Sequence, residues 1–200
     1  LGHYSYDLYR DNNFLITINL NINGYHNIYN SLAAFALAHE YILDVNIIKN
    51  AIEKYHGVGR RFEYLGKYKG AYIYDDYAHH PSEIKTTLES VKSVKHKSSW
   101  AVFQSHTYSR TKEHLDAFAD VLANFDHVII AKIYPAREIN TFNISEEMLV
   151  DKIKDKNPNV IYIDDFDKIV EFLKENVKEE DLVITIGAGP INYVSKKLVD

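Results

Sequence analysis

The residues in this sequence best suited to chemistry lie in the segment YDDYAHHPSEI, residues 74–84. Two aspartates and two histidines stand shortly before Pro81, which favours the first turn of a helix. Such side chains can bind a metal ion, exchange protons with a ligand, or satisfy the backbone donors of a turn. The segment alone is compatible with a metal site, an acid–base or ligand-binding site, and a structural turn.

A second polar segment, QSHTYSRT at residues 104–111, places His106 and Arg110 four residues apart. The planar guanidinium of arginine suits a carboxylate or a phosphate, and a neighbouring histidine can add a hydrogen bond or a proton. A salt bridge between Arg110 and a nearby acid is the structural alternative. This segment therefore predicts an anion-binding site or an ion pair.

Two further polar segments are YPAREINTF (134–142) and GAGPIN (187–192). GAGPIN follows an apolar run and precedes a helical pattern, a geometry that can receive an anion. It lacks the third glycine of a dinucleotide-binding fingerprint, and tight packing of strand on helix explains it equally well. Metal sites of this kind draw ligands from several loops, and here the other segments supply only His106 and Glu138. We therefore expect no metal ligands among these residues.

An earlier segment, GYHNIYNSLAA, gathers His26, Asn27 and Asn30 at the start of a helical pattern. Asn27 suits a helix cap. Asn30 lies one turn further in, where asparagine is unfavourable, and its side chain offers the donor and the acceptor that match an adenine edge. The sequence contains no Gly-Lys-Ser or Gly-Lys-Thr run of a phosphate-binding P-loop. Phosphate chemistry would therefore need further residues.

The elements that position these segments change in texture near residue 58. Residues 14–22 alternate between apolar and polar, as in a half-buried strand, and residues 26–43 and 45–55 carry apolar side chains at helical spacing. Residues 60–78 predict a β-hairpin that turns at Lys69-Gly70. We therefore expect a domain boundary at about residue 58.

After the hairpin, short apolar runs alternate with helical patterns. Helices are expected at residues 80–94, 110–125, 145–155, 166–177 and 191–199, and strands at 100–103, 127–133, 160–163 and 182–187. This alternation predicts an α/β fold with a mostly parallel sheet. Ligands bind beyond the carboxyl ends of such strands, where the polar segments fall, so we expect them to line one cleft.

Composition limits the class of protein. The 200 residues are 46% hydrophobic and carry a net charge of −5, which argues against a nucleic-acid partner. The sequence has no cysteine, which excludes disulfides, thiolate catalysis and Cys-ligated zinc and fits a reducing cytoplasm. It has no apolar stretch long enough to span a membrane. It begins with Leu1 instead of methionine, so we expect a piece of a longer protein.

Taken in order, six segments resemble the Mur ligases over nearly the whole chain: GYHNIYNSLAA, GVGRRFE, YDDYAHHPSEIKTTL, FQSHTYSRT, IYPAREINTFNIS and LVITIGAGPI. The chain is most similar to the branch that joins L-alanine to UDP-N-acetylmuramate. DDYAHHPSEI and HTYSRT together are specific, whereas the glycine turn and the HN…N helix are shared more widely in the family. The resemblance implies that residues 1–58 end a central ATP-binding P-loop domain and that residues 59–200 form a C-terminal Rossmann-like ligase domain.

The resemblance also implies an activity. The family uses ATP and Mg²⁺ to form an acyl phosphate on the muramyl carboxylate, which the alanine amine attacks, during peptidoglycan biosynthesis in the bacterial cytoplasm. Because the P-loop would lie upstream, the 200-residue chain alone is expected to be inactive. Two alternatives stay open: a sister ligase that attaches a recycled tripeptide to the same sugar, and a nucleotide-binding α/β module without catalysis. HTYSRT favours the alanine branch over its sister.

Residue roles follow from the same resemblance. The predicted ATP-binding residues are His26, Asn27 and Asn30 at the adenine, Arg61 at the phosphates and Asp76 at the ribose. The predicted substrate-binding residues, around the alanyl end of the product, are Tyr77, His79, His106 and Arg110. Neither a covalent nucleophile nor a metal ligand is predicted among them. The opening segment is thus interpreted as a clamp for nucleotide and amino acid.

Overall fold

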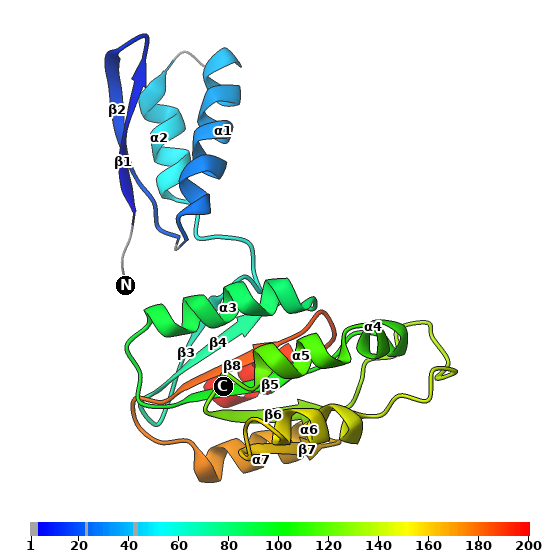
Figure 1. Ribbon diagram of the computed structural model, residues 1–200. Coiled ribbons are helices and arrows are strands. Elements are labelled where there is room, and N and C mark those ends of the chain that lie inside the picture. Colours follow the sequence, from blue (N-terminus) through cyan, green and yellow to red (C-terminus); the bar gives the residue numbers. More distant parts are fainter. Residues whose placement is uncertain (1–3, 23, 42–43) are drawn as a thin grey trace. The chain divides into compact units, whose positions relative to one another are not determined.

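The computed structural model describes residues 4–22, 24–41 and 44–200. It divides into two compact units, Leu1–Val58 and Gly59–Asp200, at the position where the sequence pattern changes. The labels of Figure 1 are used below for the elements of each unit. Within the described ranges, no helix is long and apolar enough to cross a membrane.

The first unit pairs two strands and two helices. Strands β1 (Ser5–Arg10) and β2 (Asn13–Asn19) are antiparallel, and helices α1 (His26–Tyr41) and α2 (Val45–Glu53) follow. Its core consists of apolar side chains from all four elements and the segment after β2: Leu8, Ile16, Ile18, Leu20, Phe35 and Ile48. Two expectations need correction, since β1 was not predicted and β2 ends at Asn19 and not at residue 22. The predicted end of α1, residues 42–43, lies outside the described residues.

The second unit is built on a six-stranded sheet of order β3-β4-β8-β5-β6-β7. Its strands are β3 (Glu63–Tyr68), β4 (Ala71–Asp76), β5 (Ser99–Phe103), β6 (His127–Ala131), β7 (Val160–Ile163) and β8 (Leu182–Ile186). Only the β3–β4 hairpin is antiparallel within this described sheet; the other pairs are parallel. The hairpin turns at Lys69-Gly70, whose φ angles of 46° and 87° fit a two-residue turn with both central residues left-handed. The predicted α/β fold with a mostly parallel sheet is confirmed.

Helices cover both faces of this sheet (Figure 1). They are α3 (Pro81–Ser93), α4 (Tyr108–Glu113), α5 (Leu115–Leu122), α6 (Glu146–Lys154), α7 (Phe166–Asn176) and α8 (Asn192–Val199). Helices α3, α5 and α6 contribute buried residues to one apolar layer, and α7 and α8 contribute to the other. Strands β5, β6 and β8 are therefore buried on both faces, which explains their nearly continuous apolar sequences.

The single helix expected over residues 110–125 is in fact two helices. α4 starts earlier, after Thr107, whose φ of 72° lets its side chain cap the helix by accepting from the Arg110 amide. The chain leaves helical geometry at His114, with φ −112° and ψ 20°, before α5 begins. The ring of His114 packs there against His80, with 4.7 Å between the ring centroids. α4 thus becomes a separate short element at the edge of the sheet.

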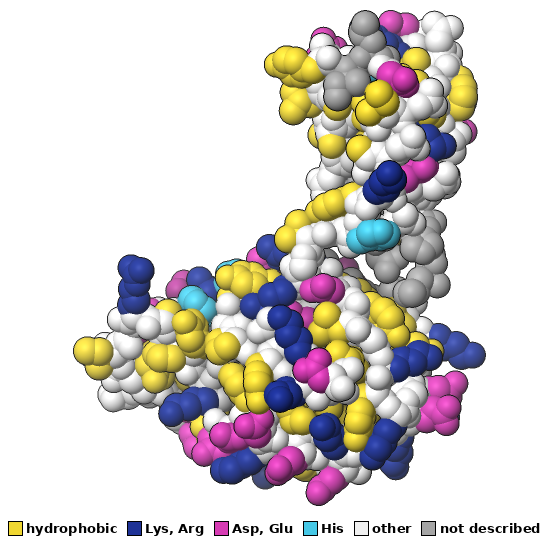
Figure 2. Space-filling view, turned by 180° about the vertical axis from the view of Figure 1, so that it is seen from behind, with side chains coloured by type: hydrophobic (Ala, Val, Ile, Leu, Met, Phe, Trp, Pro, Cys, Tyr) yellow, Lys and Arg dark blue, Asp and Glu magenta, His cyan; other side chains and the backbone are white. Residues whose placement is uncertain are grey.

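Ion pairs on the second unit are mostly exposed. Lys97 pairs with Glu180 and Lys152 with Asp116, each at 2.7 Å. Figure 2 shows positive and negative side chains interspersed over one face of this unit. Exposed pairs typically contribute about 0–1 kcal/mol each. The two apolar layers, and not these pairs, therefore dominate the stability of the second unit.

Candidate functional site

Strand β4 ends in two buried aspartates at the carboxyl edge of the sheet. Asp76 is 7% exposed and accepts hydrogen bonds from the Ala78 amide (2.8 Å), the Phe62 amide (3.1 Å) and the Thr87 hydroxyl (3.1 Å). Burial raises the pKa of Asp76, although these hydrogen bonds act in the opposite direction. A carboxylate has about four acceptor positions. Asp76 therefore keeps room for about one further donor, on Oδ1, and a ribose hydroxyl there stays a prediction.

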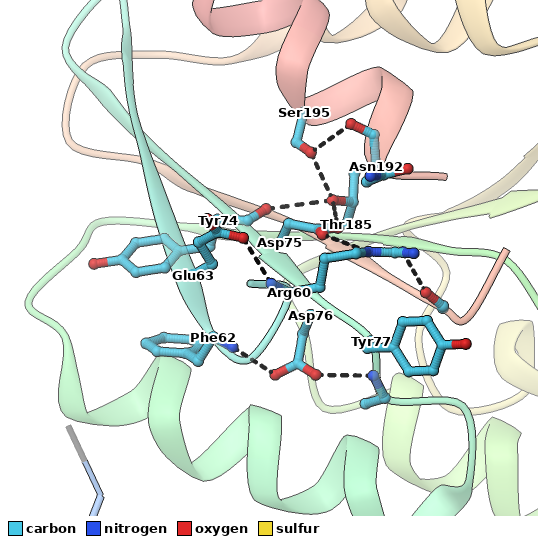
Figure 3. A network of polar contacts seen from close by, with 12 residues as sticks. Arg60, Phe62, Glu63, Tyr74, Asp75, Asp76, Tyr77, Thr185, Asn192 and Ser195 are labelled. Carbon is cyan, nitrogen blue, oxygen red and sulfur yellow. Dashed lines mark hydrogen bonds and ion pairs between the residues drawn. The ribbon is translucent and has the colours of Figure 1, made fainter. Parts of the chain in front are cut away.

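Asp75, the neighbouring aspartate, belongs to an internal polar network (Figure 3). Its Oδ2 accepts from Arg60 Nε at 2.8 Å, and its Oδ1 accepts from the Thr185 hydroxyl at 2.6 Å. Asp75 is only 2% exposed. Asp75 is therefore satisfied inside the unit, and the ligand role of Asp76 stays a prediction.

The loop after β4 is fixed by a capping box at the start of α3. His80 Nδ1 accepts from the Ser82 amide, while Glu83 Oε2 accepts from the amides of His79 (2.9 Å) and His80 (3.2 Å). Burial would raise the pKa of Glu83, but these hydrogen bonds and the nearby positive charges lower it. His80 and Glu83 thus hold the backbone from which the His79 ring projects.

Four predicted substrate-binding residues gather at this edge: Tyr77, His79, His106 and Arg110, named below the histidine cluster. The His79 ring lies 5.6 Å from the Tyr77 ring and 6.1 Å from the His106 ring, between centroids. Arg110 Nη1 lies 3.4 Å from His106 Nδ1. In the part of the chain that the structure describes, Arg110 forms no ion pair with a carboxylate. The guanidinium is therefore open to an anionic ligand.

His106 is biased toward the neutral form. Burial lowers its pKa, and the positive charges of Arg110 and His79 lower it further, with Glu138 acting in the opposite direction. A neutral imidazole has one ring nitrogen that accepts a hydrogen bond or a proton. Arginine only donates, so the 3.4 Å contact makes Nδ1 of neutral His106 the acceptor from Arg110 and leaves the ring hydrogen on Nε2.

The segment that carries His106 and Arg110 is bonded to the YPAREINTF segment. The Thr107 amide donates to the Tyr134 carbonyl at 2.8 Å, and the Tyr134 amide donates to the Ser105 carbonyl at 2.9 Å. Glu138 accepts from the Ser109 amide at 2.9 Å and from the Ser109 hydroxyl. Glu138 thus fixes the first turn of α4 and, with it, the direction of Arg110.

Arg61 and the asparagine group lie in different units. Arg61 is exposed at the start of the second unit, with its guanidinium 5.8 Å from the centre of the Tyr77 ring. In the first unit, α1 begins at His26, and the exposed Asn30 donates to the Asn27 side chain at 3.0 Å. The structure therefore joins His26, Asn27 and Asn30 in one group, and Arg61, Tyr77 and Asp76 at one edge.

Comparison with known proteins decides the family of this chain. The family profile described as "Mur ligase, glutamate ligase domain" matches residues 60–189. The chain belongs to the Mur ligase family. Its fold and the segments assembled at the carboxyl edge are therefore those of a Mur ligase C-terminal domain.

Individual relatives are similar over the whole chain. The UDP-N-acetylmuramate–L-alanine ligase of Caldanaerobacter subterraneus subsp. tengcongensis is 46% identical over 199 residues, covering 100% of this chain and 43% of that protein. The enzyme of the same name from Lachnospira eligens is 44% identical, with the same coverage. This Mur ligase chain thus spans less than half the length of the curated relatives it matches.

Solved structures share the fold. The crystal structure of the UDP-N-acetylmuramate–alanine ligase MurC from Thermotoga maritima matches with a TM-score of 0.74 and 26% identity, covering 95% of this chain and 40% of that chain. The MurF ligase of Thermotoga maritima, solved in complex with ADP, matches with a TM-score of 0.64 and 21% identity, over 99% of this chain and 44% of that one. The latter likeness concerns the fold alone.

The glycine turn of this Mur ligase is packed and not open. Gly187 has φ 149°, and a Cβ there would lie 2.6 Å from the Gln104 carbonyl oxygen. A Cβ on Gly189 would lie 2.4 Å from Gln104 Oε1. Close approach of the turn to β5 therefore accounts for these glycines, in line with the packing alternative.

Sequence reasoning missed several residues that position the site of this Mur ligase. Glu83 stands three residues after His80, a capping-box spacing that could have revealed it. Nothing in the sequence pairs Glu138 with Ser109, which lies 29 residues earlier in the chain. Nothing local separates the half-buried Arg60 from the exposed Arg61, because the partners of Arg60 lie far along the chain.

Proposed function

We propose that this chain is the C-terminal part of a UDP-N-acetylmuramate–L-alanine ligase, which acts in peptidoglycan biosynthesis in the cytoplasm of a bacterium. The observation that carries the proposal is the 46% identity, across the complete chain, to an enzyme of that name. Arg110, which lies beside His106 and whose guanidinium is open to an anion, supplies a group that could bind the carboxylate of L-alanine. Residues 1–58 would then end the central ATP-binding domain, and residues 59–200 would form the C-terminal ligase domain.

The reaction has two steps. ATP transfers its γ-phosphoryl group to the muramyl carboxylate and leaves as ADP; the amine of L-alanine then attacks the acyl carbon, and inorganic phosphate leaves as the amide forms. Such a reaction needs positioning and charge stabilisation more than a covalent nucleophile. The ATP would be held by His26, Asn27 and Asn30 at the adenine, Arg61 at the phosphates and Asp76 at the ribose.

The histidine cluster would hold the second substrate. The planar fork of Arg110 suits the carboxylate of L-alanine, through two parallel hydrogen bonds. His106, biased toward its neutral form, can donate a further hydrogen bond to that carboxylate through Nε2–H, and the alanine ammonium gives its proton to solvent before the amine attacks. Tyr77 and His79 would close the opposite side, toward the acyl group.

Magnesium belongs to the proposed reaction, but these residues do not fit a magnesium site. Among the described residues, no three His, Asp or Glu side chains come together in a group that could hold a metal ion. Asp75 is occupied by internal donors, and Asp76 keeps only about one acceptor position. We therefore assign no described residue to the metal.

The test uses the whole gene product from which this sequence comes. The enzyme is incubated with UDP-N-acetylmuramate, ATP and Mg²⁺, with either L-alanine or the tripeptide L-Ala-γ-D-Glu-meso-diaminopimelate, and products are identified by mass spectrometry. We expect alanine-dependent ADP release and the alanyl product, and no turnover by the 200-residue chain alone. Product from the tripeptide only would indicate the sister ligase, and no product with either acceptor would favour a non-catalytic module.

A further inference from the structure

Arg60, the second residue of the second unit, is held far more firmly than its neighbour Arg61. Its side chain is 21% exposed, whereas Arg61 is exposed. Its backbone has φ 62°, the left-handed region that non-glycine residues adopt rarely. A residue kept in this conformation needs surrounding contacts that stabilise it.

The guanidinium of Arg60 contacts three separate parts of the unit (Figure 3). Its Nε donates to Asp75 Oδ2 at 2.8 Å, and its Nη2 donates to the Gly187 carbonyl at 2.6 Å. Its central carbon lies 4.9 Å from the centre of the Tyr77 ring. One side chain thus joins the end of β4, the turn after β8 and an aromatic residue of the histidine cluster.

The backbone around Arg60 is tied to the same segment. The Tyr77 amide donates to the Arg60 carbonyl at 2.6 Å, and the Phe62 amide donates to Asp76 at 3.1 Å. The Arg60 amide donates to Glu63 Oε2 at 2.6 Å. Arg61 is therefore held between two residues whose backbones are bonded to the loop that carries Tyr77.

The carboxylate partner of Arg60 is itself fixed. Thr185 Oγ1 donates to Asp75, and the single hydroxyl hydrogen of Ser195 is shared between Thr185 Oγ1, at 2.9 Å, and the Asn192 carbonyl of α8, at 3.1 Å. Thr185 and Ser195 are fully buried. The network therefore runs without interruption from Arg60 to the first turn of α8.

A buried ion pair is weak grounds for a stabilising role, because desolvation offsets much of the attraction. A planar guanidinium, in contrast, fixes directions: it can donate to Asp75 and Gly187 at once while it lies over Tyr77. Lysine could keep the charge beside Asp75 but not the other two contacts in the same geometry. The chemistry of Arg60 thus suits orientation more than stability.

We propose that Arg60 is a positioning residue for the ligase reaction. It holds Arg61, on the nucleotide side, and Tyr77, on the acceptor side, in one fixed geometry. The inference rests on the proposed function. It differs from the roles given to Arg61, Asn30 and Arg110, each of which serves one substrate. Loss of Arg60 should therefore weaken the use of ATP and of L-alanine together.

The test compares Arg60→Lys with two other variants in the whole gene product. Asp75→Asn removes the ion pair without changing shape, and Arg10→Lys makes the same chemical change at an exposed arginine of the first unit. We expect kcat/KM to fall for both ATP and L-alanine, by about tenfold to a hundredfold, in Arg60→Lys and Asp75→Asn. Arg10→Lys should match the wild type. Thermal unfolding measures any loss of stability separately.

Unchanged kcat/KM per folded molecule in Arg60→Lys would overturn the proposal and leave Arg60 a stabilising residue. A fall for one substrate alone would also overturn it, since Arg60 would then bind that substrate. If Arg60→Lys does not fold, Asp75→Asn is judged by the same criteria.

Amide hydrogen exchange separates this inference from the proposed function. We expect faster exchange at residues 74–80 and 186–190 in Arg60→Lys, with α7 unchanged. An inactive wild-type enzyme would refute the proposed ligase, whereas unchanged exchange in those two segments would refute the role of Arg60 whatever the activity.

Discussion

The imidazole rings of His79 and His106 lie 6.1 Å apart, between centroids, although one follows β4 and the other follows β5. Strand β8 lies between those two strands in the sheet. The pair therefore forms across the end of β8, where the chain turns at Gly187. Two histidines beside Arg110 concentrate potential positive charge at one point, and this has consequences for pH.

Acid should destabilise the second unit partly through His106. Burial and the charges of Arg110 and His79 lower the pKa of His106 in the folded state, although the charge of Glu138 acts in the opposite direction. In the unfolded chain this histidine has its ordinary pKa of about 6.5. As pH falls, the unfolded chain therefore binds the proton before the folded chain does. The contribution of neutral His106 to the free energy of unfolding is complete above about pH 6.5. It is lost as pH falls from there through the folded-state pKa of His106. His106→Gln should therefore lose less unfolding free energy between pH 7 and pH 5 than the wild type.

The single tryptophan makes this measurable, because Trp100 lies in β5 and reports the second unit. Urea unfolding followed by its fluorescence gives the free energy of unfolding at each pH. Parallel pH profiles for the wild type and His106→Gln would contradict the prediction.

The glycine turn should tolerate no side chain at residue 187. A Cβ on Gly187 would meet the Gln104 carbonyl oxygen at 2.6 Å, and φ 149° adds backbone strain. Strained backbone of this kind costs roughly 1–3 kcal/mol, so Gly187→Ala should destabilise the second unit by at least that order. Gly59→Ala is the matched control, since its Cβ would come no closer than 3.4 Å, to Glu63. Urea unfolding of the two variants decides, and equal stabilities would refute the packing explanation.

The sheet could be predicted from sequence because its inner parallel strands are buried on both faces. LVITI at β8 and HVIIA at β6 are apolar except for Thr185 and His127, and the helices between them have clear periodicity. SYDLYR at β1 lacks such a signal, because only Leu8 is buried and the strand depends on pairing with β2. Thr107 with positive φ is equally invisible, since this conformation is rare for threonine and is imposed by its surroundings.

The site was predictable to the extent that topology assembles it. His79 and His106 meet because parallel strands bring their carboxyl ends to one edge, as the alternation of strands and helices implies. Arg60 could not be distinguished from Arg61, because its decisive contact is with Gly187, 127 residues further along the chain. The sequence predicts which edge of the sheet binds ligands, and long-range hydrogen bonds decide which residues at that edge are structural.

Asn30 should contribute to the binding of ATP and not to the binding of the acceptor, L-alanine. Its exposed amide, steadied by a hydrogen bond to Asn27, can present a donor and an acceptor to the adenine edge. In the whole gene product, Asn30→Ala should weaken ATP binding by about 1–3 kcal/mol, which lowers the apparent affinity for ATP roughly tenfold to a hundredfold. KM for L-alanine should stay nearly unchanged. Asn50→Ala, at an exposed asparagine of α2, is the control. An unchanged KM for ATP in a folded Asn30→Ala enzyme would assign Asn30 a structural role.

Arg110 should select the acceptor. L-Alanine offers little besides a methyl group, an amine and a carboxylate, so an enzyme that selects it must hold the carboxylate firmly. Arg110 has no carboxylate partner among the described residues, and its direction is fixed by α4, which Glu138 holds through Ser109. Lysine keeps the charge but loses the planar fork, so Arg110→Lys in the whole gene product should raise KM for L-alanine or lower kcat/KM for it, by about tenfold or more. KM for ATP should change much less, and the exposed Arg137→Lys in the neighbouring loop should leave both values unchanged.

Steady-state kinetics with each substrate varied in turn separates the outcomes. Loss of ATP binding with normal alanine dependence would place Arg110 at the phosphates, and no change in either would mean that the acceptor carboxylate binds elsewhere.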